Sequence, residues 1–372
     1  MRSSRDERTR SVRGRPAGTF AFLLAVCGAT LGTSVGAAAQ DADLLYVCVQ
    51  DEARIAVIDS ETHQVIRTIA LTELGFTANA RPHHVAVEPD GQHWYVSLIG
   101  ENRVVKFDRG GEMVGQFTME TPGMLAFDSA QDLLVASRSM TAVNPPARIS
   151  VIRGGSMEGD EIDVFFPRPH PMVISAEGRW AYTGSLGVNQ LAAIDLETEE
   201  VTLTTIEGPA HSLVQFALSP DGNSLVASTE LTGRLLVFDR TDPARPRQIA
   251  SIEVGPMAYD PVFAPDGRTV WVPVKGTNQV VVVDATQWQV VLRIEGNGLR
   301  QPHAVLFSSD GRWAFVSNNN KADHMAAPGH ETQAEQADGT GNVTVIDVAG
   351  HAVVKVIDLG KNVTGMGMRG AR

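Results

Sequence analysis

Short apolar runs rich in β-branched and aromatic residues, separated by turn residues, follow one another from residue 44 to residue 368. Runs such as Trp94-Tyr95-Val96-Ser97 and Val104-Val105-Lys106-Phe107 have the length and composition of strands. Tight turns ending in Gly, which tolerates a positive φ, recur between runs at Gly91, Gly178, Gly222, Gly267 and Gly311. Helical periodicity is scarce, so the pattern predicts an all-β protein.

Two further signals repeat along the chain. Apolar runs end in Asp59, Asp108, Asp195, Asp239, Asp284 and Asp347, with Arg153 closing a degenerate member. Successive members lie 42 to 49 residues apart, except the last, which follows after 63. The usual period of a four-stranded propeller blade is about 40–45 residues. The pairs Pro82-His83, Pro169-His170 and Pro302-His303 repeat too, and each His precedes the Gly of a turn by eight residues.

These repeats predict a seven-bladed β-propeller of four-stranded antiparallel blades. Blade 1 begins at Leu44 with its second strand, and we expect the C-terminal run to supply its missing inner strand and close the ring. Closure removes the sheet edges that invite aggregation. The predicted domain is 40–372, with blades at 44–72 plus 361–368, 81–119, 120–166, 167–207, 208–253, 254–296 and 297–360, the last carrying an insertion at 318–342.

Residues 1–39 have the pattern of a secretory signal peptide. Six arginines precede an apolar stretch at 20–26, and small residues end in Ala37-Ala38-Ala39. The apolar stretch is too short to span a bilayer, so we expect no transmembrane segment in the mature chain. The protein is therefore expected to be exported, in a periplasmic or extracellular location. Anchoring through Cys27 as a lipoprotein is a second reading, disfavoured by the bulk of Val26.

Cleavage changes the charge and the cysteine count. The mature chain keeps 25 basic and 41 acidic residues, a net charge of −16 against −12 for the whole chain. An acidic surface disfavours nucleic acid, so no nucleic-acid partner is expected. Cys48 is then the single cysteine, inside an apolar strand, which predicts a buried thiol and no internal disulfide. We expect a monomer.

The repeats resemble the YVTN-type seven-bladed propellers of exported proteins. Tyr46-Val47, Trp94-Tyr95-Val96-Ser97 and Ala314-Phe315-Val316-Ser317-Asn318 match the naming motif, and Ile55-Ala56-Val57-Ile58-Asp59 and Val343-Thr344-Val345-Ile346-Asp347 match its companion strand. The resemblance covers 44–368 and implies the fold. It extends to the ring domains of nitrous oxide reductase and haem d1 nitrite reductase. Many such propellers have no assigned chemistry.

Strand order sorts the histidines between the two faces of the ring. Four precede inner strands of blades 2, 4 and 7, at the face we call the top: His83, His84, His170 and His303. These blades are spread around the ring, so their side chains could converge on the axis. Secondary candidates at the top are His211, Tyr259, Asp260, Arg138 and Lys275, and in the blade 7 insertion His324, Met325 and His330. His63, His93 and His351 fall in bottom turns and receive no role.

Neutral imidazoles from several blades suit copper, zinc or iron. Three hypotheses remain open. The top face could bind a protein or small-molecule ligand, with or without a metal. It could belong to a metal- or haem-dependent oxidoreductase that uses His83, His84, His170 and His303 as ligands. The chain could also be an interaction scaffold with structural histidines, and fold alone does not choose. The adjacent pair His83-His84 is similar to copper ligands of nitrous oxide reductase, whose further ligands and second copper domain are absent.

Overall fold

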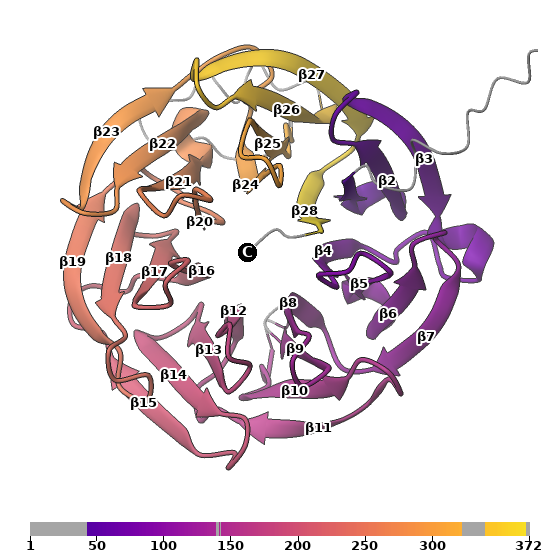
Figure 1. Ribbon diagram of the computed structural model, residues 1–372. Coiled ribbons are helices and arrows are strands. Elements are labelled where there is room, and N and C mark those ends of the chain that lie inside the picture. Colours follow the sequence, from indigo (N-terminus) through magenta and orange to yellow (C-terminus); the bar gives the residue numbers. More distant parts are fainter. Residues whose placement is uncertain (1–42, 139–140, 142, 322–338, 370–372) are drawn as a thin grey trace, which may run out of the picture. The chain divides into compact units, whose positions relative to one another are not determined.

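The computed structural model describes residues 43–138, 141, 143–321 and 339–369. They form seven four-stranded antiparallel sheets arranged as blades around a central axis (Figure 1). The predicted seven-bladed β-propeller is confirmed. The predicted signal peptide, and most of the predicted insertion in blade 7, lie outside the described residues.

Each blade runs from an inner strand at the axis to an outer strand at the rim (Figure 1). Blades 1 to 3 consist of β28 (Val363–Met368), β1 (Leu44–Val49), β2 (Arg54–Asp59) and β3 (Gln64–Ala70); β4 (Pro82–Val87), β5 (His93–Leu98), β6 (Arg103–Asp108) and β7 (Met113–Thr118); and β8 (Pro122–Asp128), β9 (Leu133–Arg138), β10 (Arg148–Arg153) and β11 (Glu158–Asp163).

Blades 4 to 7 follow the same order. They consist of β12 (Pro169–Ile174), β13 (Trp180–Ser185), β14 (Gln190–Asp195) and β15 (Val201–Thr205); β16 (Leu213–Leu218), β17 (Ser224–Thr229), β18 (Arg234–Asp239) and β19 (Arg247–Glu253); β20 (Val262–Phe263), β21 (Thr269–Val274), β22 (Gln279–Asp284) and β23 (Gln289–Ile294); and β24 (Pro302–Phe307), β25 (Trp313–Asn318), β26 (Gly341–Asp347) and β27 (Ala352–Gly360).

Short 3-10 helices occupy four of the top connections and loops: η2 (Gln50–Glu52), η3 (Leu71–Leu74), η4 (Ile99–Glu101) and η5 (Lys275–Thr277). No helix in the described ranges is long and apolar enough to cross a membrane.

The ring is closed by the two ends of the chain. Strand β28 pairs antiparallel with β1, and Leu45 lies opposite Met368. The C-terminal strand therefore supplies the inner strand of blade 1, as the sequence predicts. It also packs beside β4 of blade 2 and β24 of blade 7, so one strand connects three blades.

Adjacent blades pack face to face through the apolar side of each strand. Trp94 in blade 2 shows the pattern, because its ring stacks on Tyr46 at 4.5 Å and on Phe107 at 4.3 Å. Both tryptophan and tyrosine are at most 2% exposed. Such aromatic pairs add about 0.5–1.5 kcal/mol beyond the area that they bury. The hydrophobic core therefore consists of layers of apolar side chains between neighbouring blades. The inner strands line the axis of the ring.

A bulge near the top of the inner strands turns one residue toward the axis. The register shifts between Pro82 and Val85, with equivalent shifts in β8, β12, β16 and β24. A serine of the second strand accepts the N–H that the bulge frees, for example His84 N to Ser97 Oγ at 3.1 Å and Ala304 N to Ser317 Oγ at 3.1 Å. Bulges commonly re-aim a side chain in this way.

The closing strand passes very close to blade 2, which gives a test of closure. A Cβ on Gly365 would stand 2.2 Å from the His83 carbonyl oxygen and 2.8 Å from the His84 Cα, both backbone atoms. We expect Gly365→Ala to lower the free energy of unfolding by about 1–3 kcal/mol, because overpacking forces the backbone apart. Thermal and urea unfolding measure the change.

The matched control is Gly187→Ala, where the nearest atom to the new Cβ is Ser185 Oγ at 3.7 Å. This variant should stay within about 0.5 kcal/mol of the wild type. Equal stability of the two variants would show that the contact between β28 and blade 2 is not tight.

Candidate functional site

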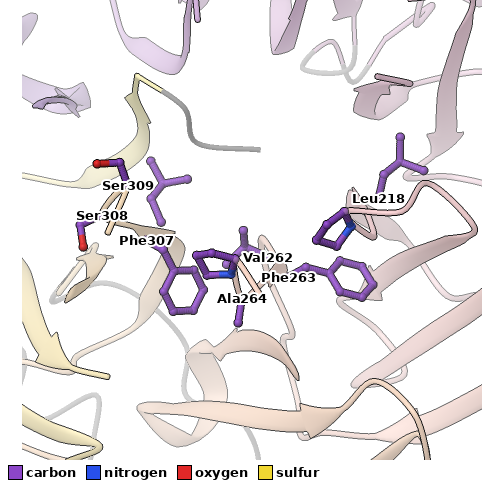
Figure 2. A pocket seen from close by; sticks show the side chains of 10 residues that line it. Leu218, Val262, Phe263, Ala264, Phe307, Ser308 and Ser309 are labelled. Carbon is purple, nitrogen blue, oxygen red and sulfur yellow. The ribbon is translucent and has the colours of Figure 1, made fainter. Parts of the chain in front are cut away.

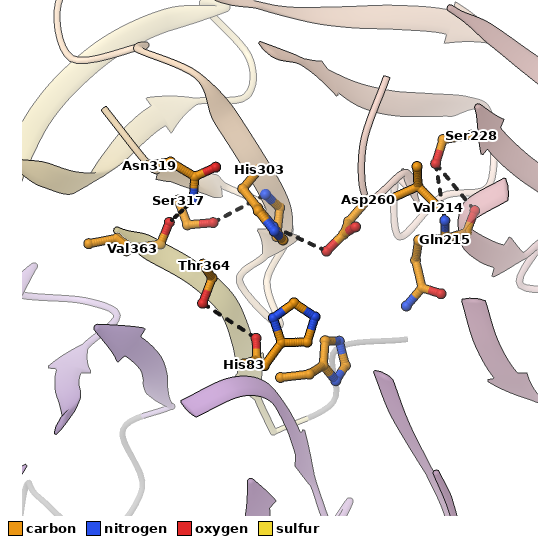
Figure 3. A network of polar contacts seen from close by, with 12 residues as sticks. His83, Val214, Gln215, Ser228, Asp260, His303, Ser317, Asn319, Val363 and Thr364 are labelled. Atoms are coloured by element: carbon orange, nitrogen blue, oxygen red, sulfur yellow. Dashed lines mark hydrogen bonds and ion pairs between the residues drawn. The ribbon is translucent and has the colours of Figure 1, made fainter. Parts of the chain in front are cut away.

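Three imidazoles lie near one another at the top of the inner strands, around the axis of the ring. His83 from β4 lies with its ring centroid 6.1 Å from that of His170 on β12 and 6.3 Å from that of His303 on β24. All three side chains are buried, with 6–7% exposed. Figure 3 shows His83 and His303 projecting from different blades toward the same central space. The structure therefore brings together three of the four principal histidines, one from each Pro-His pair.

A local backbone feature fixes each of these histidines. The residue before each Pro-His pair has a positive φ, namely Arg81 (50°), Arg168 (54°) and Gln301 (53°). Side chains with a Cβ rarely adopt this conformation, and it persists only where the surroundings impose it. The three equal turns therefore deliver the three rings to equivalent places in the ring of blades.

The hydrogen bonds of two of these rings define their tautomers. His83 Nδ1 lies 3.1 Å from Gln50 Oε1, and His170 Nδ1 lies 2.5 Å from the Val214 carbonyl oxygen. Both oxygens can only accept, so each Nδ1 carries the proton and each Nε2 keeps its lone pair. Within the described residues, His83 Nε2 is buried and has no hydrogen-bond partner.

The third ring has a carboxylate beside it. His303 Nδ1 makes no hydrogen bond in the described ranges, and its nearest charged neighbour is Asp260 Oδ2 at 3.5 Å. Figure 3 shows this contact between the His303 ring and the Asp260 carboxylate. The Asp260 N–H also donates to the His303 carbonyl oxygen at 3.1 Å. Pro261 follows Asp260 and has no N–H to donate, so the short inner strand of blade 6 begins only after it. Asp260 itself pairs with Ala304 of blade 7 in a parallel bridge.

Burial keeps the three rings neutral. It lowers the pKa of His83 and of His303 well below the usual value, and neighbouring His170 acts in the same direction on both. Burial also lowers the pKa of His170, although the Val214 carbonyl oxygen opposes that effect. The rings are therefore unprotonated at neutral pH, which is the form that binds a metal.

His84 does not join the cluster. Its Nδ1 accepts the backbone N–H of Leu125 at 3.2 Å, which ties the inner strand of blade 2 to that of blade 3. Burial lowers its pKa to about 4, while Asp260 opposes the shift. His84 therefore accepts an interblade hydrogen bond from a backbone N–H, although Asp260, His303 and His170 lie close enough to influence its protonation.

Blade 6 places further polar side chains, Tyr259 and Lys275, beside the histidines. The Tyr259 ring lies 5.1 Å from the His303 ring, and its hydroxyl donates to Glu230 Oε1 at 3.0 Å. Lys275 Nζ stands 3.5 Å from the centroid of the Tyr259 ring. Burial raises the pKa of Asp260 to about 6 and lowers the pKa of Lys275 to about 7.

The other predicted candidates stand apart from the cluster. His211 Nδ1 is 2.7 Å from Thr232 Oγ1, and its Nε2 is 3.3 Å from the Glu207 carbonyl oxygen, so both nitrogens are occupied. Arg138 pairs with Glu161 inside blade 3. His324, Met325 and His330 lie outside the described residues.

Two contributors have no signature in the sequence. Gln50, in η2 after β1, reaches His83 across a separation of 33 residues, and Glu230 of blade 5 reaches Tyr259 at the start of blade 6. A glutamine after a strand carries no motif. Gln50 could be identified from the sequence only by aligning the blades, which places the loop after β1 beside the start of β4.

The opposite end of the inner strands carries an apolar cavity of about 240 Å³ (Figure 2). It lies between the bottom ends of blades 5, 6 and 7, away from every candidate named above. Its lining residues are Leu218, Pro220, Val262, Phe263, Ala264, Pro265, Leu306, Phe307, Ser308 and Ser309.

Solved structures share the fold at low sequence identity. Hydrazine synthase of Kuenenia stuttgartiensis is 17% identical with a TM-score of 0.60, covering 76% of this chain and 88% of that chain. The dihydro-heme d1 dehydrogenase NirN in complex with DHE is 13% identical (TM-score 0.59, covering 87% and 74%). A streptogramin B lyase structure is 14% identical (TM-score 0.62, covering 74% and 87%).

These neighbours support the class of protein, a seven-bladed β-propeller, and at such identities nothing beyond the fold. No family model and no curated protein matches the chain. The resemblance to YVTN-type propellers therefore stays a prediction from the sequence.

The lowered pKa of His84 makes stability depend on pH. The unfolded chain protonates this ring near pH 6.5 and the folded chain near pH 4, so acidification through that window favours unfolding. In metal-free protein, we expect His84→Asn to reduce the slope of unfolding free energy against pH by up to about 1.4 kcal/mol per pH unit. The Asn side-chain oxygen can still accept the Leu125 N–H. Urea unfolding at several pH values between 6.5 and 4 measures the slope, and an unchanged slope contradicts the assignment.

Proposed function

We propose that this propeller is a ligand-binding module that holds one transition-metal ion at its top mouth through His83, His170 and His303. The ion keeps at least one open position, which takes the ligand. The observation that carries the proposal is the pair of Nε2 lone pairs on His83 and His170, the first buried with no partner in the described residues.

The outer contacts of the rings support a metal-binding role. Metal-bound histidines almost always donate their other N–H to a carbonyl or carboxylate oxygen, which fixes the ring and raises its basicity. Gln50 and Val214 accept in this way from His83 and His170, and Asp260 Oδ2 lies 3.5 Å from Nδ1 of His303. Three imidazoles suit zinc, copper or iron, and a set of three protein ligands is typical of sites with an open position.

The spacing of the rings sets the one requirement of the proposal. No three His, Cys, Asp or Glu side chains of the described ranges stand at the spacing of a formed metal site. Rings bound to one tetrahedral ion have centroids about 5 Å apart, from metal–nitrogen distances of about 2 Å. The observed 6.1 and 6.3 Å require the rings to close by about 1 Å. The proposal therefore requires the rings to move together when the ion binds.

Metal content tests the proposal directly. Untagged mature protein, stripped with chelator and dialysed against zinc or copper, should retain one ion per chain. His83→Ala, His170→Ala and His303→Ala should each abolish retention, because each removes a ligand. Gln50→Ala should weaken affinity by about 10- to 100-fold, as loss of an outer contact to a bound histidine typically does.

The control is His211→Ala, which removes a buried top-face imidazole whose nitrogens already have partners. It should retain the full complement of metal. Loss of metal from this control as readily as from His83→Ala, or retention by all three ligand variants, would contradict the proposal. Retention of metal by all three ligand variants would favour the hypothesis of an interaction scaffold whose histidines are structural. The oxidoreductase hypothesis has no further support, and visible absorbance of the purified protein checks it for haem.

We also propose that the propeller works outside the cytoplasm, on the strength of the signal-peptide pattern in residues 1–39. Expression of the full chain in a bacterium with an intact secretion pathway should place the product in the periplasm or medium. N-terminal sequencing should begin near Gln40. An uncleaved product that stays in the cytoplasm contradicts this proposal, and lipid on Cys27 would favour the lipoprotein reading.

A further inference from the structure

The apolar cavity at the bottom ends of blades 5, 6 and 7 has a buried floor and an exposed rim (Figure 2). The floor consists of side chains from the ends of two inner strands, each at most 7% exposed: Val262, Phe263, Ala264 and Phe307. The rim consists of exposed turn residues: Pro220, Pro265 and Ser309. A molecule that enters past the rim is therefore enclosed by apolar groups.

The volume of about 240 Å³ limits the size of an occupant. A cavity of about 150 Å³ lined by Leu, Ile and Phe binds benzene, and pockets for drug-sized ligands begin at about 300 Å³. The cavity therefore fits an apolar body of one or two rings. Phe263 and Phe307 offer it aromatic surfaces, and the Phe307 ring is itself held edge-on by Trp271 at 5.2 Å.

Blade 6 departs from its neighbours in one wall of this cavity. Blades 4, 5 and 7 begin the turn after the inner strand with a serine, whose Oγ accepts a backbone N–H five residues later at 2.9–3.0 Å: Ser175, Ser219 and Ser308. Blade 6 has Ala264 at this position. The alanine gives up that hydrogen bond and leaves the wall apolar. Departures from a local rule of this kind are expected at functional sites.

The rim of the cavity is negatively charged. Each exposed rim residue is followed directly by an aspartate, which gives the carboxylates Asp221, Asp266 and Asp310. Asp266 has its own cation, because Arg268 Nε lies 2.7 Å from its Oδ2. Arg312 acts in the same way, at longer range, on Asp310. Two arginines thus balance two of the three carboxylates.

Asp221 is held by neutral groups of its own turn. Its Oδ1 accepts from the Ser219 hydroxyl at 2.5 Å and from the Asn223 N–H at 3.0 Å. The bond from Ser219 lowers the pKa of Asp221, so the carboxylate is ionised at neutral pH. Arg240, at the bottom of the same blade, is paired with Glu177 of blade 4. A cationic group at the rim would therefore meet a negative charge that the turn itself does not neutralise.

We propose that the cavity at the bottom of blades 5, 6 and 7 is a binding site for a small aromatic amine of one or two rings. The aromatic body enters between Phe263 and Phe307, and the ammonium group stays at the rim beside Asp221. Apolar pockets with a few polar groups at defined places orient their ligands in this way. The inference goes beyond the proposed metal site and does not depend on it, because the cavity lies at the opposite end of the inner strands.

Three probes of similar shape and different charge test the site: 1-naphthylmethylamine, 1-naphthylmethanol and 1-naphthoate. Untagged mature protein, stripped of metal, is titrated with each probe at pH 7, and ligand-detected NMR gives the Kd. We expect the amine to bind with a Kd of about 0.1–1 mM, the range for a ligand of about twelve non-hydrogen atoms. The naphthoate should bind at least about tenfold more weakly, because its carboxylate would face that of Asp221.

Two variants and a matched control locate the ligand. Leu218→Trp fills the cavity from its blade 5 wall and should abolish binding of the amine and of the alcohol. Asp221→Asn should weaken the amine about two- to fivefold, as loss of an exposed ion pair does, and leave the alcohol unchanged. The control Asp90→Asn alters the same turn in blade 2, where Asp90 Oδ1 accepts the Gln92 N–H at 2.9 Å, and should change neither.

No saturable binding of the amine below about 10 mM, or binding of the naphthoate as tight as that of the amine, would overturn the inference. Unchanged binding to Leu218→Trp, once urea unfolding shows that this variant is folded, would also do so. If Leu218→Trp does not fold, Asp221→Asn decides, and a loss no larger than that of Asp90→Asn counts against the site. His83→Ala should bind the amine as the wild type does, so failure of either proposal leaves the other standing.

Discussion

Closure of the ring is the constraint on which the rest of the structure depends. The chain begins with the second strand of blade 1 and ends with its inner strand, so blade 1 is incomplete and the ring is open until both ends meet. Strand β28 then presses on β4 so closely that residue 365 has no room for a side chain. The same contact holds the top of β4, and with it His83, at the axis. The site therefore depends on the pairing of segments that are more than 300 residues apart in sequence.

The top of the ring axis buries several titratable groups close together. Imidazoles, a carboxyl and an amine sit within one small region, and burial shifts all of them toward their neutral forms. A propeller provides such a place because each inner strand contributes backbone and side chain to a shared axis. Neutral lone pairs then become the dominant chemistry of the mouth. The proposed binding of a metal by the imidazoles uses that property.

The interblade contacts show how the same residue type takes different roles. His84 and His83 are adjacent in sequence, yet the bulge sends one to a backbone N–H of blade 3 and the other to the axis. Lys106 and Lys275 are both buried on tyrosine rings, and only the first finds an anion and a carbonyl oxygen. Chemistry at this mouth follows from which partners the neighbouring blade provides.

The sequence by itself determined the seven blades, the closing strand and the face on which the histidines lie, because strand period, turn residues and strand order are local or additive signals. It placed His83, His84, His170 and His303 in one group, and only the tertiary structure showed that His84 also accepts the Leu125 N–H of blade 3. The contacts of Gln50, Glu230 and Val214 could not be predicted from the sequence either. They join residues of different blades, and no motif in the sequence relates the two partners. Distances across the axis depend on the summed packing of seven blades, and no segment of the sequence encodes that sum.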